Sequence, residues 1–311
     1  MRIVKVNKDS IANILSDLLK RSPTNYGDFQ DKVDAIIKNV RDNGDKAVFD
    51  YTAQFDKAEI NAENILVTEE EIKEAYEEVD DELIKVIRKA IKNIRDFHEK
   101  QIQKSWFETR EDGVMLGQKV TPMETCGVYV PGGKAVYPSS VLMNIVPAHV
   151  AGVKNIIMTT PPGKDGKVTA NTLVAAKEAG ATKVYKVGGA QAIAAMAFGT
   201  ESIPKVDKIV GPGNIFVALA KKAVYGNVSI DSIAGPSEIL VLADETANPR
   251  YVAADLLSQA EHDEMASAIL VTTSEELAHK VSDEIDGFLN QLSRKEIMEK
   301  SLDSFGYILV A

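Results

Sequence analysis

The chain has 311 residues, of which 45% are hydrophobic and 26% charged, and its formal net charge is −10. This length suggests about two domains, each large enough to bury a core, and the acidic balance argues against nucleic-acid or anionic-membrane surfaces, which need clustered Lys and Arg. No stretch has the ~18 apolar residues that span a bilayer, and Cys126 is the only cysteine, so no internal disulfide can form. We therefore expect a cytoplasmic protein that acts on a small, diffusing substrate.

The first part of the chain, up to about residue 110, is rich in charged residues and helical in pattern. An amphipathic helix is predicted from Ser10 to Leu19, and Ser22-Pro23 breaks it, so residues 1–23 are expected to form an N-terminal helical arm. A second helix is predicted from Asp28 to Asn43, with Gly44 at its end. The charged residues of this part are interpreted as solvated helix faces.

Two further helices are predicted before the composition changes near residue 120. Thr68 and Glu71 have the spacing of a capping box, in which each side chain bonds to the backbone N–H of the other, and a helix follows them. From Asp80 to about Gln103, apolar residues recur every three or four positions, which is the spacing of one helix face.

From residue 127 onward, short apolar strands alternate with turns and helices. The predicted strands are Gly127–Val130, Asn155–Met158, Lys183–Val187 and Lys208–Val210. Such alternation is typical of a parallel sheet with helices on both faces. Glycine-rich turns follow the carboxyl ends of these strands, and this is the edge at which open α/β sheets bind ligands.

A second change of composition follows Ser237. In this last part, strands and helices are predicted to alternate again, with strands at Glu238–Ala243, Ser267–Thr272 and Gly306–Ala311 and helices at Pro249–His262 and from about Glu275 to Leu292. The two changes of composition divide the chain into three parts.

The turn that begins at Gly211 is a partial dinucleotide-binding signature. Gly211 and Gly213 match its first two glycines, but Phe216 stands where a third glycine would allow close packing of helix on strand. The turn still opens a helix, whose backbone N–H groups could meet an anion or a carboxamide. Gly188-Gly189 and Gly132-Gly133 allow the same two interpretations, a ligand cleft or simply tight connections.

Three other features have possible chemical roles. Gln259 and His262 are three residues apart, so they share one face of a helix end and could hold one metal ion or one substrate, unless they are a cap or packed residues. Ser237 follows Gly235-Pro236 and is interpreted first as a turn residue. Cys126 offers a thiol nucleophile, but no histidine or lysine adjoins it to lower its pKa.

Five motifs, taken together, resemble those of the histidinol dehydrogenase family. They are Gly127-Val-Tyr-Val-Pro-Gly-Gly133, Val187-Gly-Gly-Ala-Gln-Ala-Ile193, Lys208-Ile-Val-Gly-Pro-Gly-Asn214, Ala234-Gly-Pro-Ser-Glu238 and Leu257-Ser-Gln-Ala-Glu-His-Asp263. The resemblance covers essentially the whole chain. It implies an α/β fold of two Rossmann-like, incompletely doubly wound domains with an N-terminal helical segment. The first domain would comprise residues 24–126 and 238–311, and the second, residues 127–237, would be inserted into it.

The resemblance also implies a reaction and the residues that bind its reactants. Tyr129, Gln191 and Asn214 match positions that contact NAD in the family, and Ser237 matches a substrate contact. The implied reaction is the four-electron oxidation of L-histidinol to L-histidine, the last step of histidine biosynthesis, through a bound aldehyde and with two NAD. The implied assembly is a cytoplasmic homodimer without nucleic-acid or membrane partners.

The metal site implied by the resemblance is only partly matched. Gln259 and His262 match two zinc ligands that border the substrate, with one zinc ion per subunit. In the family, two more ligands and a Glu-His pair of general bases follow, and we expect all of these beyond Ala311. No catalytic base is therefore assigned, and we expect the 311-residue chain to hold zinc weakly and to turn over histidinol at no measurable rate.

Two alternatives from other functional classes remain. One is a thiol-dependent aldehyde dehydrogenase that uses Cys126. The other is a non-catalytic nucleotide-binding module, which would bind the nucleotide but not the substrate.

Overall fold

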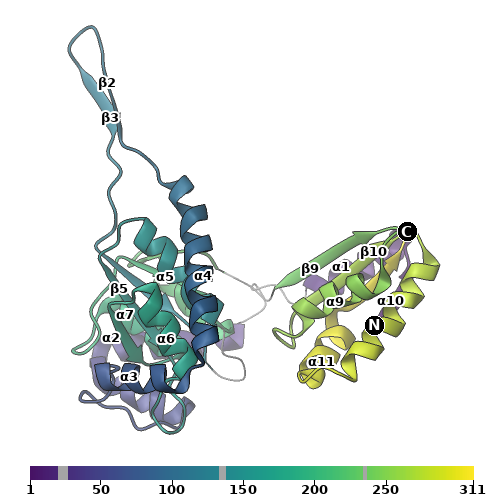
Figure 1. The fold of residues 1–311 in the computed structure, drawn as a ribbon, viewed down its shortest axis with the longest axis horizontal. Coiled ribbons are helices and arrows are strands. Elements are labelled where there is room, and N and C mark those ends of the chain that lie inside the picture. The colour runs from purple at the N-terminus through teal and green to yellow at the C-terminus, as the bar shows by residue number, and fades with distance from the viewer. Residues whose placement is uncertain (20–26, 133–137, 234–236) are drawn as a thin grey trace. The chain divides into compact units, whose positions relative to one another are not determined.

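The computed structural model of the chain describes residues 1–19, 27–132, 138–233 and 237–311 (Figure 1). Its contacts divide the chain into two compact units, one of Met1–Gly27 with Ala234–Ala311 and the other of Asp28–Ile233. Each unit has its own parallel sheet, so the α/β fold class expected from the sequence is confirmed. Within these described ranges, no helix combines the length and the apolar composition needed to cross a membrane.

The sheet of the Asp28–Ile233 unit has five parallel strands among the described residues, in the order β6-β5-β4-β7-β8. Their bounds are β4 (Thr125–Tyr129), β5 (Asn155–Thr160), β6 (Lys183–Lys186), β7 (Lys208–Val210) and β8 (Ser229–Ile230). In chain order the strands run 3-2-1-4-5, which is the order of a doubly wound sheet. The order reverses between β4 and β7, so the connections on the two sides of this point run in opposite directions.

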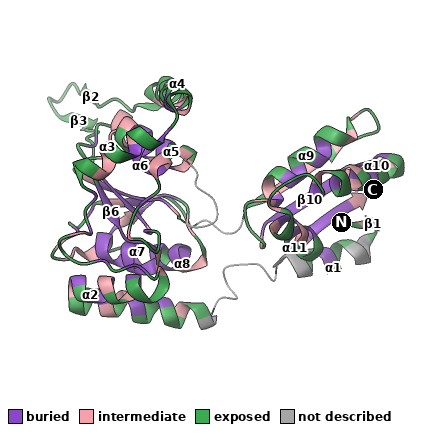
Figure 2. Cartoon of the chain, turned by 60° about the horizontal axis from the view of Figure 1, so that its bottom comes forward, coloured by how far each residue is buried: buried purple, intermediate pink, exposed green. Residues whose placement is uncertain are grey.

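Helices cover both faces of this sheet (Figure 2). On one face lie α5 (Pro138–Val150) and α6 (Ala170–Ala179), and α3 (Glu69–Glu78) and α4 (Asp81–His98) pack against them. On the other face lie α7 (Gly189–Phe198) and α8 (Ile215–Val224), beyond which α2 (Gly27–Phe55) runs. The edge of the Phe29 ring in α2 meets the ring of Phe216 in α8, with 5.4 Å between centroids.

Residues 28–126 belong to the same contact unit as residues 127–233. The segment Ile65–Val67 runs beside β6, where Lys186 N–H donates to Ile65 O (2.8 Å) and Val67 N–H donates to Val184 O (2.9 Å). α3 and α4 also bury their apolar faces against α5 and α6. The boundaries of these compact units therefore differ from those of the predicted domains, in which residues 24–126 and 238–311 form one domain.

The helices before residue 103 follow the predicted pattern, and a hairpin that was not predicted comes after them. The capping box is confirmed, because Glu71 N–H donates to Thr68 Oγ1 (3.2 Å) and Thr68 N–H donates to Glu71 Oε2 (2.8 Å). α2 consists of two helical segments that meet at Gly44, whose backbone is not helical (φ 55°, ψ −136°), so the predicted helix end at Gly44 is confirmed and a second segment continues to Phe55. After α4 and a 3-10 turn (Glu99–Gln101), an antiparallel hairpin forms that the sequence analysis did not predict, consisting of β2 (Trp106–Thr109) and β3 (Met115–Gln118).

The sheet of the other unit is also parallel, with the described strands in the order β1-β11-β10-β9. Their bounds are β1 (Arg2–Lys5), β9 (Glu238–Ala243), β10 (Ser267–Thr272) and β11 (Gly306–Val310). The helices of this unit are α1 (Lys8–Leu19), α9 (Pro249–Ala260), α10 (Glu275–Leu289) and α11 (Lys295–Phe305). Leu256, Leu270 and Ile308 are fully buried in its core.

Two elements of this unit were not predicted. Residues 1–23 were expected to form a helical arm, whereas Arg2–Lys5 is a strand of the sheet because its backbone pairs with β11, from Arg2↔Tyr307 to Lys5↔Val310. α11 was also not predicted, and its Met298 and Leu302 side chains enter the core. The predicted break at Ser22-Pro23 lies outside the described residues.

Candidate functional site

The turns after β4 and β7 meet where the strand order reverses. Tyr129 ends β4, and Gly211 directly follows β7. Gly211 has a φ of +114°, and a Cβ atom at this position would overlap the carbonyl oxygen of Tyr129. Only glycine allows this approach, so the two turns are in contact at the sheet edge where doubly wound folds bind ligands.

Tyr129 and Gln191 both contact Gly189. The hydroxyl of Tyr129, which is buried, accepts a hydrogen bond from Gly189 N–H (3.2 Å). Gly189 has a φ of +65°, and a Cβ atom there would lie 2.5 Å from Oε1 of Gln191. The structure therefore brings together two of the three residues that the resemblance assigns to NAD.

Gln191 is a buried amide without hydrogen-bond partners. It lies in the first turn of α7 and is 1% exposed, and neither its Oε1 nor its Nε2 has a partner among the described residues. Leaving such a buried group unsatisfied costs about 1–3 kcal/mol, and unsatisfied groups are rare in folded proteins. A bound polar ligand would supply both a donor and an acceptor at this point.

Asn214 and Phe216 shape the start of α8. The side-chain oxygen of Asn214 caps the helix, accepting from Phe216 N–H (3.1 Å) and Val217 N–H (3.3 Å). These bonds do not use the NH2 group of Asn214, which is an exposed residue. Phe216 occupies the position of the third glycine of the nucleotide signature, and its ring packs on Phe29 of α2. The side chain at this position therefore contributes to the packing of α8 on α2.

The remaining glycine turns pack against Pro161, which follows β5. A Cβ atom at Gly188 would lie 2.5 Å from Cβ of Pro161, and one at Gly132 would lie 2.6 Å from its Cγ. These glycines are therefore required for close packing of adjacent turns, which is the second of the two interpretations given for them. Gly133 and the motif residues 234–236 lie outside the described residues.

Asp56, just after α2, is a second incompletely satisfied group of this unit. Its Oδ2 is buried and has no hydrogen-bond partner among the described residues. Burial raises the pKa of its carboxyl to about 6. Burial also raises the pKa of Tyr129 to about 12, and the charge of Asp56 acts in the same direction, so Asp56 is within electrostatic reach of the Tyr129 hydroxyl. The sequence analysis did not single out Asp56.

Ser237, Gln259 and His262 belong to the other compact unit. Ser237 directly precedes β9, and its carbonyl accepts from Ser267 N–H (3.1 Å) at the start of β10. α9 ends at Ala260, so His262 lies in the turn after the helix and not on the helix as predicted; its N–H still donates to Gln259 O (3.2 Å). Because this turn leads into β10, all three residues lie at the amino-terminal edge of their parallel sheet.

The donor set at this edge suits a metal ion only in part. The imidazole of His262 and the amide oxygen of Gln259 are both possible zinc ligands, and His262 is exposed. Across the described ranges, no group of three or more His, Cys, Asp or Glu residues has the arrangement of a metal site. Gln259 and His262 thus remain a pair of donors, which can bind a metal ion only together with other ligands.

Cys126 is poorly suited to act as a nucleophile. The residue is 4% exposed in β4. Burial raises the pKa of its thiol to about 11, and the charge of Lys208 offsets this effect only in part. Because the thiolate is the reactive form, the thiol-dependent aldehyde dehydrogenase alternative loses its chemical basis.

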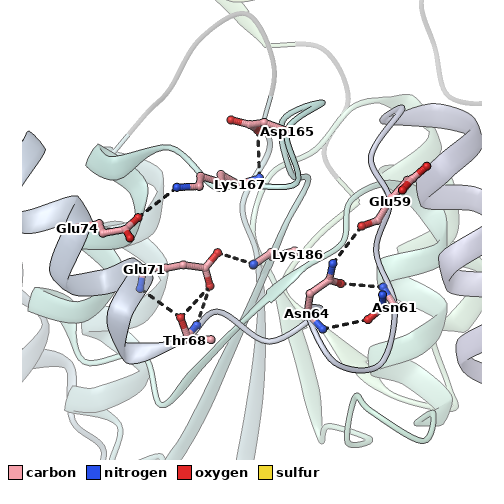
Figure 3. Close-up of polar contacts among 9 residues, drawn as sticks. All are labelled: Glu59, Asn61, Asn64, Thr68, Glu71, Glu74, Asp165, Lys167 and Lys186. Atoms are coloured by element: carbon pink, nitrogen blue, oxygen red, sulfur yellow. Dashed lines mark hydrogen bonds and ion pairs between the residues drawn. The ribbon is translucent and has the colours of Figure 1, made fainter.

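A cluster of ion pairs lies at the carboxyl end of β6 (Figure 3). Lys186 Nζ lies 2.5 Å from Oε1 of Glu71, and Lys167 Nζ lies 3.1 Å from Oε2 of Glu74. Burial opposes ionisation of Glu71, but hydrogen bonds from Lys186 and Thr68 outweigh it and lower the pKa of the Glu71 carboxyl. The cluster ties α3 to the sheet, so not all charges of the N-terminal part lie on solvated helix faces.

We expect Asp56→Asn to stabilise the protein near pH 8 but not near pH 4. The folded state raises the pKa of Asp56 from 3.8 to about 6, so it holds the proton more tightly than the unfolded chain and loses stability as the pH rises between these values. Because the carboxyl is only partly buried, the gain near pH 8 is about 1 kcal/mol.

Urea unfolding at the two pH values measures this difference. Asp50→Asn, at an exposed position of α2, is the control and should change the free energy of unfolding little at either pH. A gain of equal size at both pH values for Asp56→Asn would contradict the assignment of a raised pKa.

Comparison with known proteins supports the resemblance seen in the sequence. The family model described as histidinol dehydrogenase matches residues 19–311. The chain is 55% identical to the histidinol dehydrogenase of Halalkalibacterium halodurans over 311 residues, which is 100% of this chain and 71% of that protein. It is 58% identical to the histidinol dehydrogenase of Bacillus subtilis over 309 residues, 99% of this chain and 71% of that protein.

A solved structure agrees with these sequence matches. The crystal structure of histidinol dehydrogenase from Elizabethkingia anophelis superposes with a TM-score of 0.90 at 40% identity, covering 100% of this chain and 71% of that chain. The fold and the sequence therefore lead to the same conclusion, and the chain belongs to the histidinol dehydrogenase family.

Proposed function

We propose that the chain binds NAD at the turns around Tyr129, Gln191 and Gly211. The observation that carries this proposal is the buried amide of Gln191, which has no partner among the described residues. It lies at the carboxyl edge of a doubly wound sheet, beside the reversal of strand order, and this is where such folds bind nucleotides. Membership of a dehydrogenase family supports a hydride-accepting cofactor.

NAD, when bound, accepts hydride, and the protein holds and orients it. Gln191 can both donate and accept a hydrogen bond, and the NH2 group of Asn214 is a further donor at the start of α8. The start of α8 adds a partial positive charge that suits a phosphate, while the N–H groups of Phe216 and Val217 are already capped by Asn214. Gly211 keeps the turn before α8 against Tyr129, so these groups lie along one edge of the sheet.

We also propose that the substrate is L-histidinol, which is oxidised to L-histidine, with zinc held by Gln259 and His262 together with further ligands. The names of the relatives support this substrate. An imidazole nitrogen and an amide oxygen are donors that zinc accepts, and the nearby Ser237 offers a hydroxyl. When bound, zinc would orient the substrate by contact with the imidazole and amine nitrogens of histidinol. A cytoplasmic location is part of this proposal.

A homodimer is the assembly we propose, with the β2–β3 hairpin in its interface. Both strands of the hairpin are exposed along their whole length, and Trp106, Phe107 and Met115 are 54%, 62% and 66% exposed. Figure 1 shows the hairpin extending away from the rest of its unit. An isolated two-stranded hairpin is marginally stable in water, and exposed apolar patches commonly mark protein interfaces, so a second copy of the chain would bury these side chains.

Gln191→Leu should raise the stability of the free protein and weaken NAD binding. Leucine removes a buried amide without partners, which we expect to add about 1 kcal/mol to the free energy of unfolding. It also removes the donor and the acceptor offered to NAD, so the dissociation constant should rise about tenfold. Calorimetric titration with NAD and urea unfolding measure the two effects.

The exposed Gln54 provides the matched control. Gln54→Leu should leave both the stability and the dissociation constant for NAD nearly unchanged. If Gln191→Leu binds NAD as tightly as the wild-type chain, the assignment of NAD to this edge is wrong.

Binding of L-histidinol should depend on zinc and on His262. With zinc present, calorimetric titration should detect L-histidinol binding, and His262→Ala should weaken that binding at least about tenfold because one zinc ligand is lost. His279→Ala, which removes an exposed histidine of the same unit, should leave it unchanged. Binding of NAD with no zinc-dependent binding of histidinol would instead support the non-catalytic nucleotide-binding module.

Trp106→Ser combined with Met115→Ser should shift the protein from dimer to monomer. Both side chains are more than half exposed in the single chain, and apolar burial is the main driving force for association. Sedimentation velocity across a concentration series measures the change. Tyr225→Ser, which removes an aromatic side chain that is 66% exposed, is the control; a monomeric wild-type chain would refute the proposed assembly.

A further inference from the structure

Both backbone hydrogen-bonding groups of Gly211 are held by one ion pair. The N–H of Gly211 donates to Oδ2 of Asp231 (2.8 Å), and its carbonyl accepts from Nζ of Lys221 (2.9 Å). Lys221 and Asp231 are themselves in direct contact as an ion pair. Lys221 is 3% exposed, so its charge is almost wholly removed from water and is balanced by Asp231.

Three elements are joined through this arrangement. Gly211 follows β7, Lys221 lies in the second half of α8, and Asp231 follows β8. Side chains on a helix lean toward its amino-terminal end, which allows Lys221 to reach back to the turn from which α8 starts. Asp231 is fixed in turn by the N–H of Ser232, which donates to its Oδ1 (2.6 Å).

Stability alone does not explain why charged residues occupy this place. Removing the charge of Lys221 from water is costly, and an apolar residue of similar volume often gives equal or greater stability, whereas the Asp231 side chain remains 32% exposed. The pair does offer one cationic donor and one anionic acceptor, and these match the two polar groups of a single residue. That residue is Gly211, which has a positive φ and lies against the Tyr129 carbonyl, so few backbone conformations are possible for it.

We propose that Lys221 and Asp231 are positioning residues for NAD, which act through Gly211 and do not touch the nucleotide. By holding both polar groups of Gly211, they fix the direction in which the Gly211–Asn214 turn leaves β7. They thereby fix the start of α8, where the Asn214 side chain and the first N–H groups lie. This proposal rests on the proposed binding of NAD at this edge.

A second ion pair with a buried lysine in the same unit provides a matched comparison. The Lys186 side chain is 6% exposed and pairs with Glu71, as the Lys221 side chain, 4% exposed, pairs with Asp231. Lys186 and Glu71 tie α3 to β6, and neither hydrogen-bonds to Gly211. Loss of this pair should affect stability without changing the Gly211–Asn214 turn.

The test compares two double variants that each remove both charges, because removal of the carboxylate alone would leave a buried lysine charge unpaired and could unfold the protein. Lys221→Met with Asp231→Asn keeps an acceptor for Gly211 N–H but removes the donor to its carbonyl. Lys186→Met with Glu71→Gln is the matched variant, in which glutamine preserves the capping box. Both are measured well below their unfolding temperatures, by calorimetric titration with NAD and by hydrogen exchange of residues 208–216.

We expect the Lys221/Asp231 variant to bind NAD about tenfold more weakly, which corresponds to the loss of one charged hydrogen bond, and to exchange faster at residues 208–216. The Lys186/Glu71 variant should bind NAD within about twofold of the wild-type chain. Unchanged NAD binding in the first variant, or equal weakening in both, would overturn the positioning role. Failure of the wild-type chain itself to bind NAD would instead overturn the proposed cofactor, and this proposal with it.

Discussion

The contact between the Gly211 backbone and the Tyr129 carbonyl constrains the whole nucleotide edge of the sheet. β4 and β7 pair in parallel from Cys126↔Lys208 to Val128↔Val210, so β4 extends one residue beyond its partner and places Tyr129 beside the next turn. A side chain at Gly211 would force these strands apart. The start of α8, the cap formed by Asn214 and the contacts of Gly211 with Lys221 and Asp231 all depend on this approach.

The elements that could be predicted are those whose signals are local in the sequence. The alternation of strands, turns and helices in residues 127–230 appears in the structure as the doubly wound sheet, because apolar runs and glycine turns reflect short-range backbone preferences. The Thr68 capping box was equally local and was confirmed. For the site, motif matching singled out Tyr129 and Gln191, and the structure connects both of them through Gly189.

Features that depend on distant partners could not be predicted in the same way. Arg2–Lys5 has too few residues to show a strand pattern, and only its pairing with β11 makes it one. The hairpin of Trp106–Gln118 buries none of its strand residues, so no burial pattern marks it. Asp56 and Lys221 acquire their roles from burial by other segments, and Asp231 acquires its role from its contact with Lys221. Lys221 did carry one usable signal, since it and Lys222 are the charged residues in the otherwise apolar helix α8.

The pairing of β1 with β11 has a consequence for the order in which the chain folds during synthesis. β1 leaves the ribosome well before its partner strand, Gly306–Val310. The Asp28–Ile233 unit is continuous in sequence and can fold as soon as it has emerged, because domains generally fold as units. Until β11 is made, the apolar side chains of β1 have no sheet to join. The charged residues Arg2 and Lys5 beside them would help to keep the unpaired segment from aggregating.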